Sequence, residues 1–590
     1  MNRWLPYVCF PLIAMALLAT APANAASYYL DSVSGNDANT GLAPQQAWKT
    51  LAPVNARVFV PGDRILLRAG TTYTGQLAPR GCGALTAGRP NPIVIDSYGD
   101  GPRPRIDGQG KVQSALYLNN VEYWTALHLE ITNDGPTPQP GRAGVQLQLD
   151  NFGTAHDIRL TDLDIHDVNG SDSKKAGGGA GIRWDAVGTT KKSRFDGLII
   201  ENCSLSRCDR DGIIGGGFSQ RNQWFPSLHV VIRNNRLNDI GGDGIVPIAC
   251  DGCVVEHNSV SGSGVRTPRN EGSAGIWPWG SDNTIIQYND VSGQRGALDA
   301  QSFDSDWNCQ NTLIQYNYSH DNEGGFLLVC DDGSQKGALN AGNTGTIVRY
   351  NLSVNDGYRA GGESPAIFIT GPCRNTSLYN NTIYTSSSTG PAGKTTLVQM
   401  GNWDGWAANT RFYNNIFDAA NPAQYDLGKA QQAIFDRNLY YGPQQNPPHD
   451  PDAIRQDPLF ENPGRSDNAN NYRLQPGSPA LNDGLNIPDA GAVDLSNFQL
   501  SDRQAPSLGA FQAPGAAVAP PVVAARAPRR STTRRANSRT RSVSPRPLRV
   551  RPARRRVVYP YYVLPRVRVY RPHVVRRKPP KPRVKKRTRK

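Results

Sequence analysis

The strongest constraint on this chain of 590 residues is a short pattern that recurs through its middle. Each copy alternates apolar and polar residues and then places an asparagine. These asparagines lie 23 to 34 residues apart, at Asn235, Asn258, Asn289, Asn317, Asn351, Asn381, Asn415 and Asn438. Strands of period two that repeat at such intervals, with glycine turns between them, predict a β-solenoid. We expect the asparagines to stack as a ladder, each amide hydrogen-bonded to the coils above and below.

The composition agrees with an all-β fold. Glycine (60 residues) and proline (45) are abundant and only 19% of residues are charged, which excludes a helical bundle or coiled coil. An earlier segment, Leu198-IIENCSL, aligns with the repeat and places Cys203 at the asparagine position. We expect about ten coils between roughly residues 27 and 512, with parallel strands about 4.8 Å apart.

The ends of this region resemble those of a known superfamily. The opening Tyr28-YLDSVSGNDANTG and the closing Asp457-PLF and Tyr472-RLQPGSPALNDG resemble secreted bacterial members of the pectate-lyase-like proteins, which carry the PbH1 repeat. The resemblance implies a right-handed parallel β-helix, and it is specific for the fold but not for an activity. We expect an N-terminal cap and first coils over 26–110, repeats over 111–440 and closing coils over 441–512. This superfamily contains lyases, glycosidases, epimerases and non-enzymatic adhesins. The activity of the present chain must therefore be inferred from its site.

The first 25 residues read as a signal peptide. Arg3 precedes the apolar run from Val8 to Ala19, and residues 23–25 form an A-x-A cleavage site. We therefore expect a secreted protein, periplasmic or extracellular, without a transmembrane segment. Eight cysteines remain after cleavage, an even number that suggests disulfides in an exported protein. Cys250 with Cys253, and Cys309 with Cys330, are the candidate pairs.

The charge is divided between two parts of the chain. Residues 526–590 hold 26 of the 64 basic residues and no acidic one, so the preceding part carries 38 basic against 49 acidic residues. The basic, proline-rich tail over 513–590 is expected to be disordered in isolation. A polycation binds anionic polymers by releasing counterions. An anionic envelope polymer is the favoured partner, ahead of a merely solubilising role and of nucleic acid, and surface association would follow.

Two aspartates suggest a hydrolytic site. Asp211 and Asp243 each lie eight residues beyond their ladder position and should stack on adjacent coils. Carboxylates about 5 to 5.5 Å apart suit a retaining glycosidase. The alternative is structural, since an aspartate before glycine also accepts backbone hydrogen bonds in a tight turn.

The next two coils suggest elimination chemistry instead. Arg295 and Glu323 each lie six residues beyond their asparagines, and Asp299 and His320 lie nearby. A lyase must neutralise the uronate carboxylate and then remove a proton; Arg295 could do the first and His320 the second. The alternative is that Arg295 pairs with Glu323 and that His320 belongs to a polar turn.

A third group of carboxylates suggests calcium. Asp304, Asp306, Asp331 and Asp332 should share one corner of neighbouring coils. Calcium takes six to eight oxygen ligands, and it could bridge to a uronate substrate. A solvated acidic loop is the alternative.

Aromatic residues complete the candidate site. Trp277 and Trp279 alternate on one strand, and Trp307 follows on the next coil. They could stack on sugars, or they could face the core. The function favoured by these patterns is cleavage of an acidic, uronate-containing polysaccharide by β-elimination. A glycoside hydrolase with paired carboxylates and a non-catalytic glycan-binding or envelope-structural protein are the alternatives.

Overall fold

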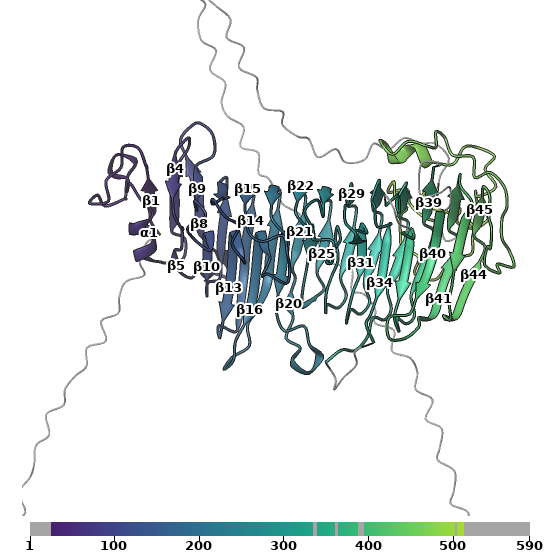
Figure 1. The fold of residues 1–590 in the computed structure, drawn as a ribbon. Coiled ribbons are helices and arrows are strands. Elements are labelled where there is room, and N and C mark those ends of the chain that lie inside the picture. The colour runs from purple at the N-terminus through teal and green to yellow at the C-terminus, as the bar shows by residue number, and fades with distance from the viewer. Residues whose placement is uncertain (1–24, 334–338, 360–363, 387–394, 502–503, 513–590) are drawn as a thin grey trace, which may run out of the picture. The chain divides into compact units, whose positions relative to one another are not determined.

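The computed structural model describes residues 25–333, 339–359, 364–386, 395–501 and 504–512. These residues form a parallel β-helix whose coils follow one another along a single axis (Figure 1). The predicted tail and all but the last residue of the predicted signal peptide lie outside the described residues. Within the described ranges, no helix combines the length and apolar character that a membrane span requires.

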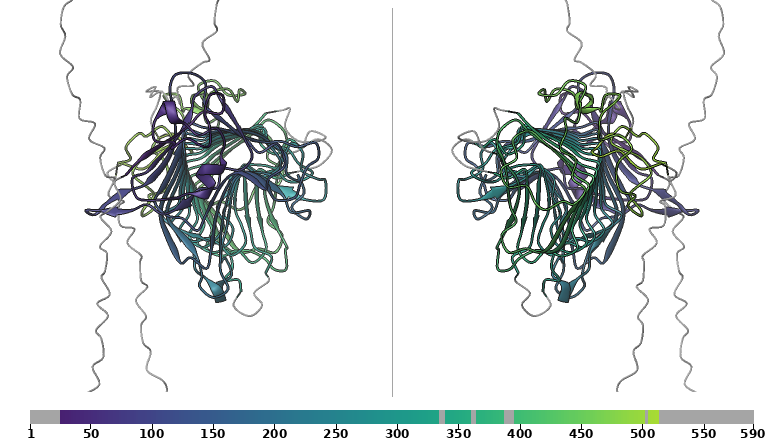
Figure 2. Two further views of the ribbon diagram at one scale, coloured as in Figure 1. Left: turned by 90° about the vertical axis from the view of Figure 1, so that its left-hand side faces the viewer. Right: turned by 90° about the vertical axis from the view of Figure 1, so that its right-hand side faces the viewer.

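Three faces of parallel strands enclose the core (Figure 2). Sheet I consists of β1 (Ser27–Leu30), β3 (Arg64–Arg68), β8 (Ile93–Tyr98), β11 (Trp124–Leu127), β14 (Thr154–Thr161), β17 (Arg194–Glu201), β21 (Val231–Arg233), β25 (Val254–Glu256), β28 (Ile285–Gln287), β32 (Leu313–Gln315), β35 (Ile347–Arg349), β38 (Ser377–Tyr379), β41 (Ala408–Tyr413) and β44 (Gln431–Asp436), with β20 (Ser227–Leu228) and β24 (Cys250–Asp251) beside it. Sheet II consists of β4 (Thr72–Thr74), β9 (Arg105–Asp107), β12 (Glu130–Asn133), β15 (Asp164–Val168), β18 (Ser204–Cys208), β22 (Arg236–Ile240), β26 (Ser259–Ser263), β29 (Asp290–Ser292), β33 (Tyr318–His320), β36 (Leu352–Val354), β39 (Thr382–Thr385), β42 (Ile416–Ala419) and β45 (Leu439–Tyr441). Its thirteen strands indicate more coils than the ten expected, because the first coils lack the asparagine by which the repeat was recognised.

The third face is built in pieces. Its first five strands are β10 (Ser114–Asn119), β13 (Arg142–Asp150), β16 (Gly179–Val187), β19 (Asp211–Gly216) and β23 (Ile245–Val246), and its last five are β31 (Phe303–Ser305), β34 (Leu327–Cys330), β37 (Ile367–Thr370), β40 (Thr395–Gly401) and β43 (Ala423–Asp426). The short pair β27 (Gly272–Ser273) and β30 (Leu298–Asp299) lies between them in sequence. Single bridges from Ile276 to Ile245 and Phe303 connect the two halves. Pro247 and Pro278 explain the interruption, because proline donates no hydrogen bond to a strand ladder.

The predicted asparagine ladder runs along the turn between sheets I and II. Asn289 Nδ2 donates to Asn317 Oδ1 at 3.0 Å, and Asn317 Nδ2 donates to Asn351 Oδ1 at 2.9 Å. The same contact continues to Asn438, whose amide reaches the carboxylate of Asp450. The ladder therefore satisfies buried polar groups in the coils from Asn235 to Asn438.

The two ends of the coil are closed differently. The helix α1 (Ala52–Ala56) crosses the N-terminal end and buries Val54 in the core (Figure 2). The remaining small elements are β2 (Val58–Phe59), β5 (Arg80–Gly81), the hairpin of β6 (Ala84–Thr86) and β7 (Arg89–Asn91), and short 3-10 helices at Pro44–Gln46, Arg221–Gln223 and Ala469–Tyr472. Residues 441–512 were expected to form closing coils. Beyond Tyr441, the last residue of β45, the described part of this range is largely irregular and packs Ile487, Val493 and Leu500 against a row of tyrosines.

Candidate functional site

The interrupted third face brings the predicted tryptophans and aspartates together. The bridge between Ile276 and Phe303 places Trp277 beside Asp304 on the next coil. Because successive residues of a strand point to opposite sides, Ile276 and Phe303 fill the core while their neighbours point outward. Trp279 and Asp306, two residues further along, take the same outward direction. Aromatic and acidic side chains thus share one outer surface.

The three tryptophans form a continuous aromatic platform on this surface. The rings of Trp277 and Trp279 meet edge to face with centroids 6.2 Å apart, and Trp279 stacks on Trp307 at 5.1 Å. Trp277 is only 7% exposed, but it packs in a small cluster with Val246 and Ala274 that is separate from the core. The pair Trp277 and Trp279 therefore lies on the outer face, which was one of the two expected arrangements.

Asp304 and Asp306 are carboxyl groups that burial makes harder to ionise. Burial raises the pKa of Asp304 well above its usual range, and the charges of Asp306 and Asp299 raise it further. Burial also raises the pKa of Asp306 to about 6, although hydrogen bonds from Cys330 and the Trp307 amide oppose this change. A carboxyl group that is partly protonated near neutral pH can act as a general acid.

Asp299 is the third carboxyl group of this cluster, and its backbone conformation is strained. Asp299 and Ala300 have φ values of 52° and 67°, a region that side-chain-bearing residues seldom adopt in succession. Glycines on both neighbouring coils make room for the strained turn. A Cβ on Gly272 would lie 1.6 Å from Asp299 Oδ2, and one on Gly324 would lie 1.8 Å from the Asp299 carbonyl oxygen. Burial raises the pKa of Asp299, whereas Lys174 and Arg359 favour its charged form.

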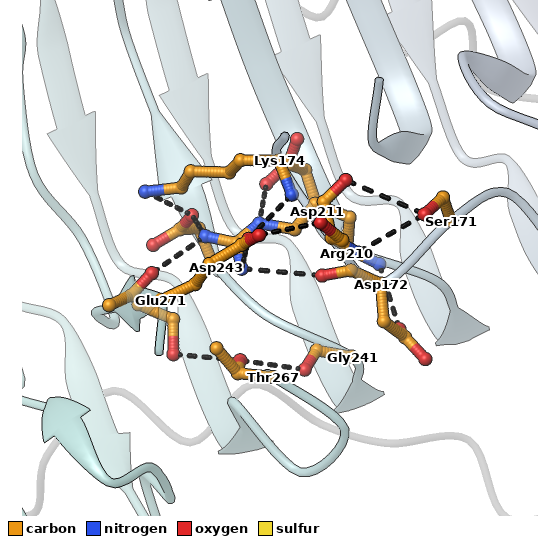
Figure 3. Close-up of polar contacts among 12 residues, drawn as sticks. Ser171, Asp172, Lys174, Arg210, Asp211, Gly241, Asp243, Thr267 and Glu271 are labelled. Atoms are coloured by element: carbon orange, nitrogen blue, oxygen red, sulfur yellow. Dashed lines mark hydrogen bonds and ion pairs between the residues drawn. The ribbon is translucent and has the colours of Figure 1, made fainter. Parts of the chain in front are cut away.

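Asp211 and Asp243 do lie on adjacent coils, as expected. The buried guanidinium of Arg210 contacts both carboxyl groups (Figure 3). Arg210 Nη2 is 2.5 Å from Asp243 Oδ2, and Arg210 Nε is 3.5 Å from Asp211 Oδ1. Asp243 Oδ1 accepts from the Ala274 amide and from Trp277 Nε1. Both oxygens of Asp243 are thus engaged by the protein. This arrangement favours a structural role for the pair over the nucleophile and acid of a glycosidase.

The neighbouring Asp211 has a different environment. Burial and the charge of Asp243 raise the pKa of Asp211 to about 7. Burial would also raise the pKa of Asp243, but Lys174 and Arg210 hold it below its usual range. The two carboxyl groups therefore differ in charge, as expected for close neighbours.

The residues expected to perform elimination do not all converge. Arg295 Nε lies 3.9 Å from Glu323 Oε1, so the predicted ion pair forms, and Arg295 also contacts the Tyr358 hydroxyl. His320 belongs to β33 of sheet II, on a different sheet from β31 and β34. Burial would lower the pKa of His320, but hydrogen bonds with Asp290 and Asp321 outweigh burial and raise it to about 9. A histidine that is protonated at neutral pH is poorly suited to act as a base.

The expected calcium corner is only partly assembled. Asp331 accepts hydrogen bonds from the Asn308 and Gly333 amides and from Asn340 Nδ2. In the described part of the chain, no group of three or more His, Cys, Asp or Glu side chains is arranged to hold a metal ion. Calcium binding through Asp304, Asp306, Asp331 and Asp332 stays a prediction.

The expected disulfides are absent among the described cysteines, all eight of which are free thiols. Cys309 Sγ contacts the Pro278 carbonyl oxygen at 3.4 Å, whereas Cys330 Sγ contacts Asp306 Oδ1 at 3.0 Å. The thiols of this candidate pair therefore have different acceptors. Cys250 and Cys253 lie next to each other, since a hydrogen bond with Cys253 raises the pKa of Cys250.

Two cavities lie elsewhere, between the coil and the C-terminal segment. Their volumes are about 860 and 420 Å³, and Tyr350 and Asn380 contribute to the larger one while Tyr288 and Tyr318 line the smaller one. Neither contains the carboxylates of the third face.

Three residues of the site were not predicted from the sequence. Lys174 reaches it from a loop more than 100 residues before Trp277, and Arg359 contacts the Asp299 carbonyl oxygen from a later coil. Arg210 was overlooked although it directly precedes Asp211. Arg210 forms an ion pair with Asp243. Its position beside an aspartate that should be buried was the local signal, because a buried charge needs a partner.

Comparison with known proteins supports the fold and offers a functional lead. The family described as "right handed beta helix region" matches residues 180–383, and the chain is a right-handed parallel β-helix. A lacto-N-biosidase of Bifidobacterium longum subsp. longum is 28% identical over 616 aligned positions, which cover 84% of this chain. The chain spans only 37% of the length of that relative.

A solved structure gives a similar result. The GH136 lacto-N-biosidase of Eubacterium ramulus superposes with a TM-score of 0.54 and 25% identity, covering 70% of this chain and 67% of that one. A shorter similarity, 35% identity over 68 residues, links 12% of this chain to 11% of the alpha-1,3-galactosidase A of Akkermansia muciniphila.

Proposed function

We propose that this protein is a glycoside hydrolase whose active site is formed by Asp299, Asp306 and the tryptophan platform. The observation that carries the proposal is that carboxyl groups with raised pKa values lie on the same outer face as three contacting tryptophans. Aromatic faces suit sugar rings, and paired carboxyl groups suit cleavage of a glycosidic bond. The similarity to two lacto-N-biosidases supports the same reaction class.

The environments of the two carboxyl groups suggest their roles. Asp306, with a pKa of about 6, is suited to protonate the oxygen of the leaving sugar. Lys174 and Arg359 favour the carboxylate form of Asp299, which could attack the anomeric carbon or activate a water molecule. Asp304 is a third, buried carboxyl group of this cluster. Its pKa is raised well above the usual range, and its Oδ1 has no hydrogen-bond partner among the described residues.

The β-elimination favoured by the sequence has less support. Its expected base, His320, lies on another sheet and is held in two ion pairs. Its expected neutralising group, Arg295, is paired with Glu323. A non-catalytic glycan-binding role would use the same tryptophans but gives no reason for the raised pKa values of the carboxyl groups.

A product assay separates these functions. The protein would be incubated with a chromogenic para-nitrophenyl lacto-N-bioside and with a panel of neutral and uronate-containing glycans, with calcium and with a chelator. We expect new reducing ends from the wild-type protein, and at least about 100-fold slower release of them from a glycan substrate by Asp306→Asn. An ultraviolet-absorbing unsaturated uronate would contradict hydrolysis in favour of elimination. Binding without any product would favour the non-catalytic role.

A further inference from the structure

A loop inserted before β16 is fastened beside the proposed site. Ser173 Oγ donates to Glu271 Oε1 at 2.5 Å, and the Lys174 amide donates to Glu271 Oε2 at 2.6 Å. Burial alone would raise the pKa of Glu271, but these hydrogen bonds outweigh it and lower that pKa. A charged acceptor makes such hydrogen bonds strong, so the loop has a defined position.

A buried arginine anchors the surface beneath this loop (Figure 3). Arg210 has a fully buried side chain, and besides pairing with Asp243 it donates to the Gly272 carbonyl oxygen at 2.8 Å. Gly272 is the residue against which the Asp299 carboxylate lies. Arg210 therefore connects the position of Asp243 to that of Asp299.

Lys174 carries this charge network to the molecular surface. Its Nζ is 3.3 Å from Asp243 Oδ2 and 4.9 Å from the centroid of the Trp277 ring. Its side chain is 45% exposed, whereas that of Asp243 is 1% exposed. An ammonium group has three N–H donors, and the contact with Asp243 occupies one of them. The other donors belong to an ammonium group that lies over the Trp277 ring on a partly exposed side chain.

We propose that Lys174 determines substrate specificity at this site, by donating a hydrogen bond to a hydroxyl or carbonyl oxygen of the sugar that the tryptophan platform binds. This inference rests on the proposed function. The same ammonium holds the Trp277 ring in place by a cation–π contact, which is strongest for tryptophan. The charge of Lys174 also acts on Asp299, so the residue links sugar binding to the carboxylate group.

The test compares Lys174→Met, Lys174→Arg and the matched control Lys175→Met. Methionine keeps an unbranched apolar stem and removes the charge, and arginine keeps the charge. Lys175 is an exposed residue of the same loop for which the structure shows no side-chain contact. With the substrate that the wild-type protein hydrolyses best, we expect Lys174→Met to raise KM about tenfold. The kcat at neutral pH should fall by a smaller factor, because Asp299 loses one of the charges that favour its carboxylate form. Lys174→Arg should recover most of the affinity, and Lys175→Met should match the wild type.

A second measurement needs no turnover and so distinguishes the two proposals. The tryptophan emission of Lys174→Met, without substrate, should differ from that of the wild type and of Lys175→Met, because Trp277 loses its charged neighbour. If the emission is unchanged, the contact between Lys174 and Trp277 is wrong whether or not the protein is a hydrolase. An unchanged KM in an active Lys174→Met enzyme would overturn the specificity role.

Discussion

The thiol of Cys330 donates a hydrogen bond to Asp306, with Sγ 3.0 Å from Oδ1. The Trp307 amide donates to the same oxygen at 2.5 Å. Both hydrogen bonds that the described residues provide to this carboxyl group therefore end on Oδ1. Since β31 and β34 are adjacent parallel strands, the thiol and the carboxyl group are held by neighbouring coils. This arrangement restrains the Asp306 carboxyl group from two neighbouring coils.

Replacing Cys330 should therefore affect turnover more than binding. We expect Cys330→Ala to lower kcat about tenfold with little change in KM, because Asp306 loses an orienting donor. Cys330→Ser restores a hydroxyl donor of similar size and should retain more activity than the alanine variant. Equal activity of both variants would show that the thiol only fills space. Thermal unfolding of each variant provides the control for folding.

The three carboxyl groups should respond differently to amide substitution. Asp299→Asn and Asp306→Asn remove the proposed catalytic groups, and we expect kcat to fall by at least about 100-fold. Asp304→Asn replaces a carboxyl group whose pKa is raised well above its usual range by a neutral amide, and it should keep most of the activity. Steady-state kinetics with one substrate test all three. Full activity in Asp299→Asn or Asp306→Asn would exclude that residue from catalysis.

The pH dependence should follow the protonation of Asp306. A proton donor with a pKa of about 6 is protonated below that pH, so kcat/KM should decline above about pH 6 and approach a tenfold loss per unit. Binding of substrate at high pH would persist, because the tryptophan platform does not ionise. A profile that stays level from pH 6 to pH 9 would contradict the assignment of Asp306 as the acid.

The asparagine ladder should contribute measurably to stability. Asn317→Ala removes the oxygen that accepts from the Asn289 backbone amide and from Asn289 Nδ2, and it removes one donor to Asn351 Oδ1. A buried group that is left unsatisfied costs about 1 to 3 kcal/mol. We expect a reduced free energy of unfolding in urea. Gln424→Ala, which removes a surface hydrogen bond to Gln445, should change it by less than about 0.5 kcal/mol. A similar effect of both substitutions would argue against the ladder as a stabilising element.

The basic tail gives a prediction that is independent of catalysis. We propose that the protein is exported and that residues 513–590, which lie outside the described residues, hold it on an anionic envelope polymer. A variant ending at residue 515 should lose retention on cells at low salt but keep its fold and activity. Added salt should release the full-length protein, because exposed charges are screened. Equal retention of both proteins at low salt would refute the tethering role.

Several features of the fold could be predicted because they depend on neighbours in the chain and on a fixed period. Alternation of period two predicts strands, and the interval between asparagines places Asn289 next to Asn317 on adjacent coils. The same reasoning brought Trp277, Trp279 and Trp307 together, and it correctly paired Arg295 with Glu323. It also placed Asp211 and Asp243 on neighbouring coils.

The sequence by itself thus determined the solenoid, its ladder and the set of residues that could carry chemistry. Only the tertiary structure decided which of them meet, because the direction of each side chain depends on turns and inserted loops of unequal length. Such a loop places Lys174 above Trp277, a strained turn directs Asp299 over Gly272, and a buried Arg210 neutralises Asp243. The spacing of the repeat suggested that His320 lies near Arg295 and Asp299. His320 instead lies on another sheet, where it pairs with Asp290. These positions depend on contacts between residues that are far apart in the sequence, and no local sequence pattern records such contacts.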